Sequence, residues 1–143
     1  MELYTGWEKR FETFNKSVLL LKEVRSLKLD ELSHLEKEGI IKRFKFTLEL
    51  AWKTLKDKME FDGLILDKIS PKVVVKEAYK AKYIDKVDVW LKMIDDRNLL
   101  THSYDFETFD KVIPVIQIEY ANTINELYLS LLKSEQRIFF KLG

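Results

Sequence analysis

The chain contains no cysteine, which excludes disulfide bonds and thiolate metal sites. Glycine and proline are also scarce, with 4 and 2 residues in 143, and this scarcity favours long helices over strands joined by tight turns. No apolar run approaches the roughly 20 residues of a membrane-spanning helix, and the first residues lack the basic and apolar regions of a secretory signal. We therefore expect a cytoplasmic protein that does not contact a membrane.

A strong charge of either sign is missing too. The 25 basic and 24 acidic residues leave a net charge of +1, so bulk charge does not indicate a nucleic-acid-binding protein. Any contact with RNA or a nucleotide then has to be local. The apolar fraction of 46% is large enough to bury a core and argues against disorder, and the length fits a single domain over residues 1–143.

Apolar residues recur at spacings of three and four along most of the chain, which is the period of an amphipathic helix. Ser70-Pro71 is a typical helix start, and Pro114 predicts that the last helix either starts late or bends. The pattern predicts a loop or short helix over the leucines from 27 to 35, and helices at about 5–25, 38–60, 71–82, from Asp85 or Asp88 onward, and 105–136. We predict an all-α antiparallel four-helix bundle with an extra short helix.

The helix expected from about residue 86 changes from apolar to polar along its length. Its first turns place four apolar side chains on one face, those of Val87, Trp90, Leu91 and Ile94. At about 100° per residue, Asn98 and Thr101 lie about 30° from the centre of this face, and Arg97 and His102 lie about 70° to either side. Polar groups in such a place must be paired, be solvated in a groove or take part in chemistry.

Two interpretations of this polar cluster stay open. In the structural one, Arg97 pairs with a nearby aspartate or another helix, His102 lies at a helix C-terminus where a cation is favourable, and Tyr104 buries its ring with a solvated hydroxyl. In the functional one, the cluster is a site, because polar groups gathered on an apolar face are statistical markers of function.

The residues from Arg97 to Tyr104 have the form R-x4-H-x-Y and resemble the signature of HEPN-domain proteins from prokaryotic HEPN/MNT toxin–antitoxin pairs, where MNT is a minimal nucleotidyltransferase. Three further blocks of sequence surround the signature, at residues 39–56, 70–81 and 89–98. They resemble, in the same order, blocks of the subfamily also called nucleotidyltransferase substrate-binding proteins, and the resemblance covers about residues 7–130. Lys45 departs from an acidic position of the family, and Lys82-Tyr83 replaces a small apolar pair; neither lies in the signature.

The resemblance implies a homodimer whose two signatures face each other across a groove. It implies metal-independent RNA cleavage, service as the partner subunit of a separately encoded MNT, and in some pairs AMP transfer to the signature tyrosine. On this basis Arg97 is expected to stabilise phosphate and His102 to act as general acid or base, because cleavage needs a permanent cation and a near-neutral proton acceptor. Asp96 or Asn98 would orient them, and Tyr104 would be the modified switch.

Further candidates lie on the helix expected at 38–60. Arg43, Glu49, Trp52 and Lys53 are possible groove or partner contacts, although Trp52 also fits the core and the two cations also fit a solvated face.

No metal or cofactor site is recognised in the chain; ATP and Mg are expected only on the MNT partner, and RNA or a nucleotide is the expected ligand. Three hypotheses stay open: an RNase toxin silenced by its partner, a non-catalytic subunit that binds substrate for the transferase, and a dimeric scaffold.

Overall fold

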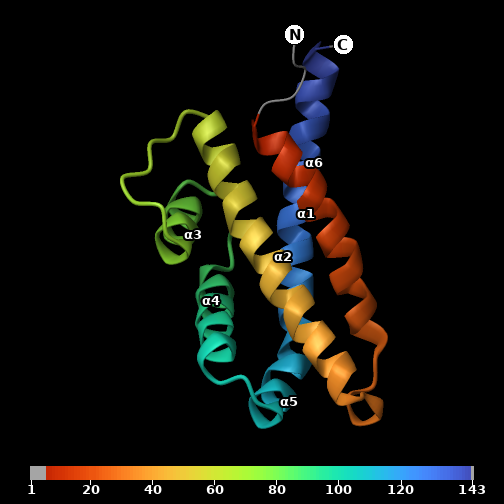
Figure 1. Cartoon of the computed structure of the whole chain (residues 1–143). Coiled ribbons are helices and arrows are strands. Elements are labelled where there is room, and N and C mark those ends of the chain that lie inside the picture. The colour runs from red at the N-terminus through yellow and green to blue at the C-terminus, as the bar shows by residue number, and fades with distance from the viewer. Residues whose placement is uncertain (1–5, 143) are drawn as a thin grey trace.

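The computed structural model describes the backbone of residues 6–142 and the side chains of residues 7–135. Helices α1 (Gly6–Lys22) and α2 (His34–Phe61) lie antiparallel and are joined through two short 3-10 turns, η1 (Glu23–Ser26) and η2 (Leu29–Glu31). Helices α3 (Pro71–Lys80) and α4 (Val87–His102) follow each other along another side of α2 (Figure 1). The chain then returns through α5 (Phe106–Val115), the π-turn η3 (Ile116–Tyr120) and α6 (Ala121–Leu142).

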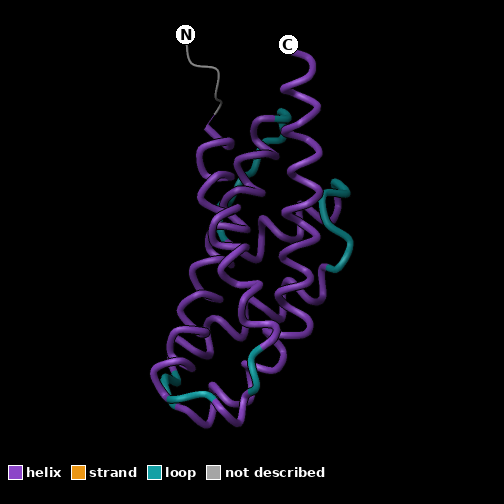
Figure 2. Tube along the Cα trace, turned by 90° about the vertical axis from the view of Figure 1, so that its right-hand side faces the viewer, coloured by secondary structure: helices purple, strands orange, loops and turns teal. Residues whose placement is uncertain are grey.

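These elements confirm the predicted fold class. Helices α1, α2 and α4 and the run from α5 to α6 alternate in direction, and α3 is the extra short helix. Figure 2 shows the helices along the long axis of the bundle. From α2 to α5, the links between the helices range from three residues between α4 and α5 to nine between α2 and α3. No strand occurs within residues 6–142, and none of the described helices is long and apolar enough to cross a membrane.

The helix starts show where local sequence signals were sufficient. Helix α2 begins at His34 and not near residue 38, because Ser33 and Glu36 form a reciprocal capping box that adds a turn. The start predicted at Ser70-Pro71 is confirmed, and the Ser70 hydroxyl accepts the Val73 N–H. Helix α4 begins at Val87, between the two starts predicted at Asp85 and Asp88; Lys86 is the N-cap residue, and it makes no side-chain cap bond.

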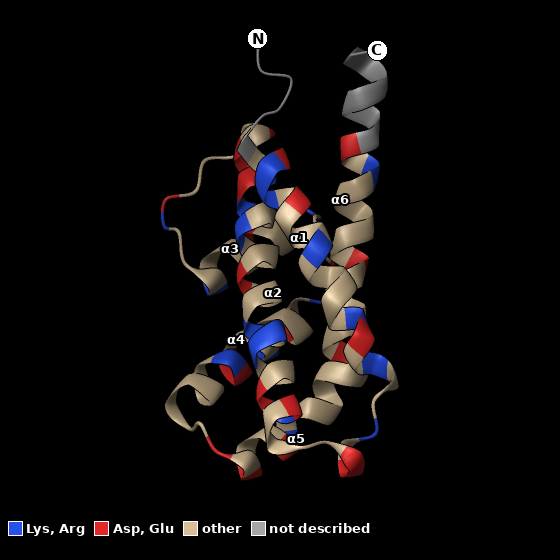
Figure 3. Cartoon of the chain, turned by 45° about the vertical axis from the view of Figure 1, so that its right-hand side comes forward, with Lys and Arg blue, Asp and Glu red and all other residues tan. Residues whose placement is uncertain are grey.

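The core forms where the apolar stripes of α1, α2 and α6 meet. Phe14, Phe44 and Leu55 are fully buried, and each such side chain contributes about 1.5–3 kcal/mol through removal from water. Aromatic rings join the helices in pairs: Phe11 of α1 stacks on Tyr128 of α6 with ring centroids 5.6 Å apart. Acidic and basic residues mix along the helices in the view of Figure 3.

Pro114 lies inside α5, which begins at Phe106, so the late start that we considered does not occur. The irregularity is the π-turn η3, which follows one residue after Pro114. Proline removes one intrahelical N–H and crowds the preceding turn, which weakens the regular hydrogen-bond ladder there. The helical run continues through the π-turn without a break into α6.

Candidate functional site

Helix α4 is rotated relative to the prediction. Its buried side chains are those of Trp90, Met93, Ile94 and Leu100. This face is turned by roughly 75° from the one predicted from the first turns, because Met93 and Leu100 reach the core while Val87 and Leu91 are only half-buried. Arg97 therefore lies near the middle of the inner face, whereas Asn98, Thr101 and His102 are exposed.

Arg97 is a half-buried cation with few partners. Its Nη1 atom lies 3.8 Å from Oε2 of Glu49 on α2, which is too long for a hydrogen bond. Its Nε atom is enclosed and has no hydrogen-bond acceptor among the described residues. The Nη atoms also form no hydrogen bond with a described residue, and the guanidinium is partly exposed at the surface between α2 and α4. A permanent cation with free N–H donors at such a place suits an anionic ligand.

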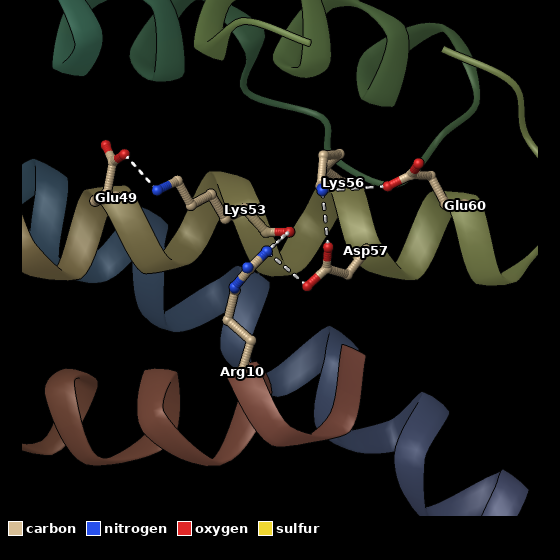
Figure 4. Close-up of polar contacts among 6 residues, drawn as sticks. All are labelled: Arg10, Glu49, Lys53, Lys56, Asp57 and Glu60. Carbon is tan, nitrogen blue, oxygen red and sulfur yellow. Dashed lines mark hydrogen bonds and ion pairs between the residues drawn. The ribbon is translucent and has the colours of Figure 1, made fainter. Parts of the chain in front are cut away.

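Glu49 connects the candidates on α2. Its Oε2 accepts a hydrogen bond of 3.0 Å from Nε1 of Trp52, and its Oε1 pairs with Nζ of Lys53 at 3.0 Å. Figure 4 shows the Glu49–Lys53 pair on α2, along with Arg10 of α1, which reaches Asp57 on the same helix. Partial burial opposes ionisation of Glu49, but Lys53, Trp52 and Arg97 together hold its pKa below the usual 4.5.

An open groove of about 630 Å³ lies along α2 beside the end of α4. Two signature residues, Arg97 and Tyr104, line it together with Glu49. The remaining lining comes from one stripe of α2 at helical spacing, namely Leu35, Glu38, Ile41, Lys42, Lys45 and Phe46. Neither Lys42 nor Lys45 forms an ion pair with a described residue.

The other signature residues lie around this groove. Tyr104 is 59% exposed in the link between α4 and α5, and its ring meets that of Phe109 edge-on at 4.7 Å. His102 is the exposed last residue of α4 and does not line the groove. Asp96 accepts a hydrogen bond from the Tyr120 hydroxyl, and Asn98 faces solvent.

The candidates on α2 separate into two sides. Arg43 points toward α1 and η1, where it donates to the Leu20 carbonyl at 2.9 Å and lies 3.6 Å from Glu23. Trp52 is 7% exposed and contributes mainly to the core, and Lys53 lies over its ring at 5.8 Å. Of these candidates on α2, only Glu49 lines the groove.

Sequence reasoning missed Lys42, Phe46 and Tyr120. Lys42 and Phe46 share a helix face with Glu49, at positions seven and three residues before it, so a search along that stripe could have found them. The bond from Tyr120 to Asp96 crosses between elements and has no local signal. Among the described residues, no group of three or more histidine or acidic side chains is placed to hold a metal ion.

Residues 9–133 match the protein family described as "Nucleotidyltransferase substrate binding protein like". The chain belongs to this family. It is also similar to the "Probable ribonuclease HepT" of Haemophilus influenzae, with 32% identity over 72 residues, 48% of this chain and 49% of that protein. The chain thus spans about half the length of this curated relative.

A solved structure extends the family likeness to the fold. The crystal structure of a protein from Thermus thermophilus matches 83% of this chain and 98% of its own, with 30% identity and a TM-score of 0.71. The resemblance to HEPN-type, nucleotidyltransferase substrate-binding proteins is therefore confirmed at the level of family and fold. The family match spans the signature and the groove-lining stripe of α2.

Proposed function

We propose that this family member is the toxin of a HEPN/MNT pair, a metal-independent RNA endonuclease. The observation that carries the proposal is the groove in which Arg97 and Tyr104 of the signature lie together with the unpaired Lys42 and Lys45. The three cations outnumber the two carboxylates in the lining, those of Glu38 and Glu49, and Oε1 of Glu49 is already paired with Lys53. The groove therefore has a local excess of positive charge that the nearly neutral chain lacks as a whole, and RNA binding depends on such charge. The relative named a probable ribonuclease supports the same activity.

In the proposed reaction, His102 takes the proton from a ribose 2′-hydroxyl, and that oxygen attacks the adjacent phosphorus. The bond from phosphorus to the 5′-oxygen breaks, and the leaving oxygen takes up a proton, which leaves a cyclic phosphate and a 5′-hydroxyl. Histidine suits this role because it can accept and return a proton near neutral pH. Arg97 stabilises the negative charge that develops on the phosphoryl oxygens.

The positions of Arg97 and His102 favour a site built from two copies. The two residues are five positions apart, so they point about 140° apart around the α4 axis, with Arg97 at the groove and His102 in solvent. A second copy facing the first would bring its own histidine to the groove. The exposed apolar side chains of Leu35 and Phe46 at the groove, 78% and 55% exposed, would be covered in such a homodimer.

Tyr104 would be the inhibitory switch. Its exposed hydroxyl would lose its proton and attack the α-phosphorus of ATP bound with Mg on an MNT partner. The bond from that phosphorus to the oxygen shared with the β-phosphate would break, and pyrophosphate would leave. The attached AMP would add bulk and negative charge to the groove beside Arg97, and so would compete with the RNA phosphate.

Cleavage of RNA by purified protein in the presence of EDTA tests the activity. Arg97→Ala and His102→Ala are expected to lower the rate by about 100-fold or more. Arg25→Ala and His34→Ala are matched controls, since both residues lie outside the groove, and they should stay within about twofold of wild type. Equal cleavage by all five proteins, or cleavage by none, would refute the catalytic assignment.

The second candidate function is a non-catalytic subunit that holds a nucleotide or acceptor for a nucleotidyltransferase. The family description names such substrate binding, and the groove with its three cations suits a nucleotide phosphate. Under this function the wild type would not cut RNA, but it would bind ATP or co-purify with a small nucleotidyltransferase. Failure to bind either would count against it.

A further inference from the structure

A buried tyrosine connects the last helical run to the signature. Tyr120 ends the π-turn η3 and has no exposed surface, and its ring stacks on Phe44 of α2 with centroids 5.5 Å apart. Its hydroxyl donates a hydrogen bond to Oδ2 of Asp96, the residue directly before Arg97. Burial and the Asp96 carboxylate raise the pKa of Tyr120 above its ordinary value.

The π-turn determines that this tyrosine, and not a neighbour, faces α4. A π-turn holds about one residue more than a turn of α-helix, which rotates all later side chains by about 100°. Regular helix from Val115 to Ala121 would therefore move the phenol away from Asp96. Single π-turns occur frequently at functional sites.

Few other contacts fix the end of α4 that carries the signature. Among the residues of α4 that follow Arg97, Leu100 alone is buried, and Asn98, Leu99, Thr101 and His102 are exposed. On the other side of the helix, Lys72 of α3 holds Asp95 at 2.7 Å, but both of these side chains are about half-exposed. The bond from the fully buried Tyr120 thus ties the residue directly before Arg97 to the helical run from α5 to α6.

The rotation of α4 controls where the Arg97 guanidinium lies. The guanidinium is not tied to Glu49 by a hydrogen bond, and its Nε atom has no described acceptor, so it follows the backbone of α4. A rotation of about 10° moves a side-chain tip about 6 Å from the helix axis by about 1 Å. A displacement of that size can lower a catalytic rate by about 100-fold.

We propose that Tyr120 is a positioning residue for Arg97: its hydroxyl holds Asp96 and thereby sets the rotation of α4 that keeps the guanidinium in the groove. This inference rests on the proposed RNA-cleaving function for its kinetic consequence, but its structural consequence can be measured without RNA.

The chain contains a matched control. The Tyr83 hydroxyl donates to Oδ2 of Asp62 at 2.6 Å, and its pKa is also raised, by burial and by that carboxylate. This second Tyr–Asp bond joins the segment after α3 to the end of α2, and neither residue lines the groove. Tyr83→Phe removes the same kind of hydrogen bond at a distance from the signature.

The experiment compares Tyr120→Phe, Asp96→Ala, their double variant and Tyr83→Phe in the full chain, after circular dichroism and thermal unfolding show that each is folded. We expect Tyr120→Phe to lower kcat by about 10- to 100-fold with KM within about threefold, and Tyr83→Phe to stay within twofold. The kcat of the double variant should fall no further than that of Asp96→Ala alone, because the two changes remove the same hydrogen bond.

A proton–nitrogen NMR spectrum of the arginine Nε–H groups supplies the readout that does not need RNA. The Arg97 signal, assigned with Arg97→Lys, should shift or broaden in Tyr120→Phe and not in Tyr83→Phe. If wild type does not cleave RNA, the proposed function fails and this signal alone decides the inference. An unchanged signal in Tyr120→Phe, an equal change in Tyr83→Phe, or a changed signal without a loss of kcat in a protein that cleaves RNA would overturn it.

Discussion

Two adjacent leucines within the signature test the observed rotation of α4. Leu100 is fully buried, whereas Leu99 is 46% exposed. The face predicted from the first turns of the helix places both leucines about 130° from its centre, and so predicts no difference between them. Replacement of each by alanine therefore distinguishes the observed rotation from the predicted one.

We expect Leu100→Ala to lower the free energy of unfolding by about 3 kcal/mol, the usual cost when a fully buried leucine leaves a cavity. Leu99→Ala should cost about 0.5 kcal/mol or less, because its side chain is already largely in water. For a domain of this size the larger change corresponds to a fall in Tm of roughly 10 °C.

Urea unfolding at one fixed protein concentration, followed by circular dichroism, measures both changes. The fixed concentration is necessary because association of two copies would add to the apparent stability. Equal losses for the two variants, or a larger loss for Leu99→Ala, would refute the rotation, and with it the placement of Arg97 near the middle of the inner face.

Three further predictions concern caps and titrating groups. Ser70→Ala removes the cap on the Val73 N–H and should cost about 1 kcal/mol, with faster hydrogen exchange in α3; unchanged exchange there would contradict it. The lowered pKa of Glu49 makes its contribution to stability complete above about pH 4.5 and lost as the pH falls through the lowered value. Carbon-13 NMR should find its midpoint below 4.5 in wild type and nearer 4.5 in Lys53→Ala. The raised pKa of Tyr83 means that its stabilisation is present below pH 10 and is lost as the pH rises further. The free energies of unfolding of wild type and Tyr83→Phe should therefore converge as the pH rises above 10. A constant difference between them over this range would show that the Tyr83 hydrogen bond is not the source of the pH dependence.

Most of the fold could be predicted from the sequence because its signals are local. The apolar stripes of α1, α2 and α6 follow the helical period. Ser70 and Pro71 mark the start of α3, where the Ser70 hydroxyl accepts the N–H of Val73, only three residues later. The start of α2 at His34 could also have been predicted, since Ser33 and Glu36 have the spacing of a capping box.

The rest depends on contacts between elements. The rotation of α4 follows from which of its side chains find space against α2, α3 and α5, and the pattern of its first turns cannot weigh Met93 and Leu100 against Val87 and Leu91. The signature could be identified in the sequence, but the orientation of Arg97 toward the groove and of His102 toward solvent follows from that packing. The π-turn and the bond from Tyr120 to Asp96 likewise have no counterpart in local spacing.

The link that carries Tyr104 is very short. Helix α4 ends at His102 and α5 begins at Phe106, so three residues join them, and Asp105 caps the second helix through the Thr108 N–H. Three residues span at most about 10 Å when fully extended, so the link has almost no slack to be drawn out of the bundle. A modifying enzyme whose active site lies in a deep, narrow cleft could not reach Tyr104, because the link cannot extend into such a cleft. An enzyme that acts on Tyr104 needs a shallow active site that fits over the closed corner between the two helices.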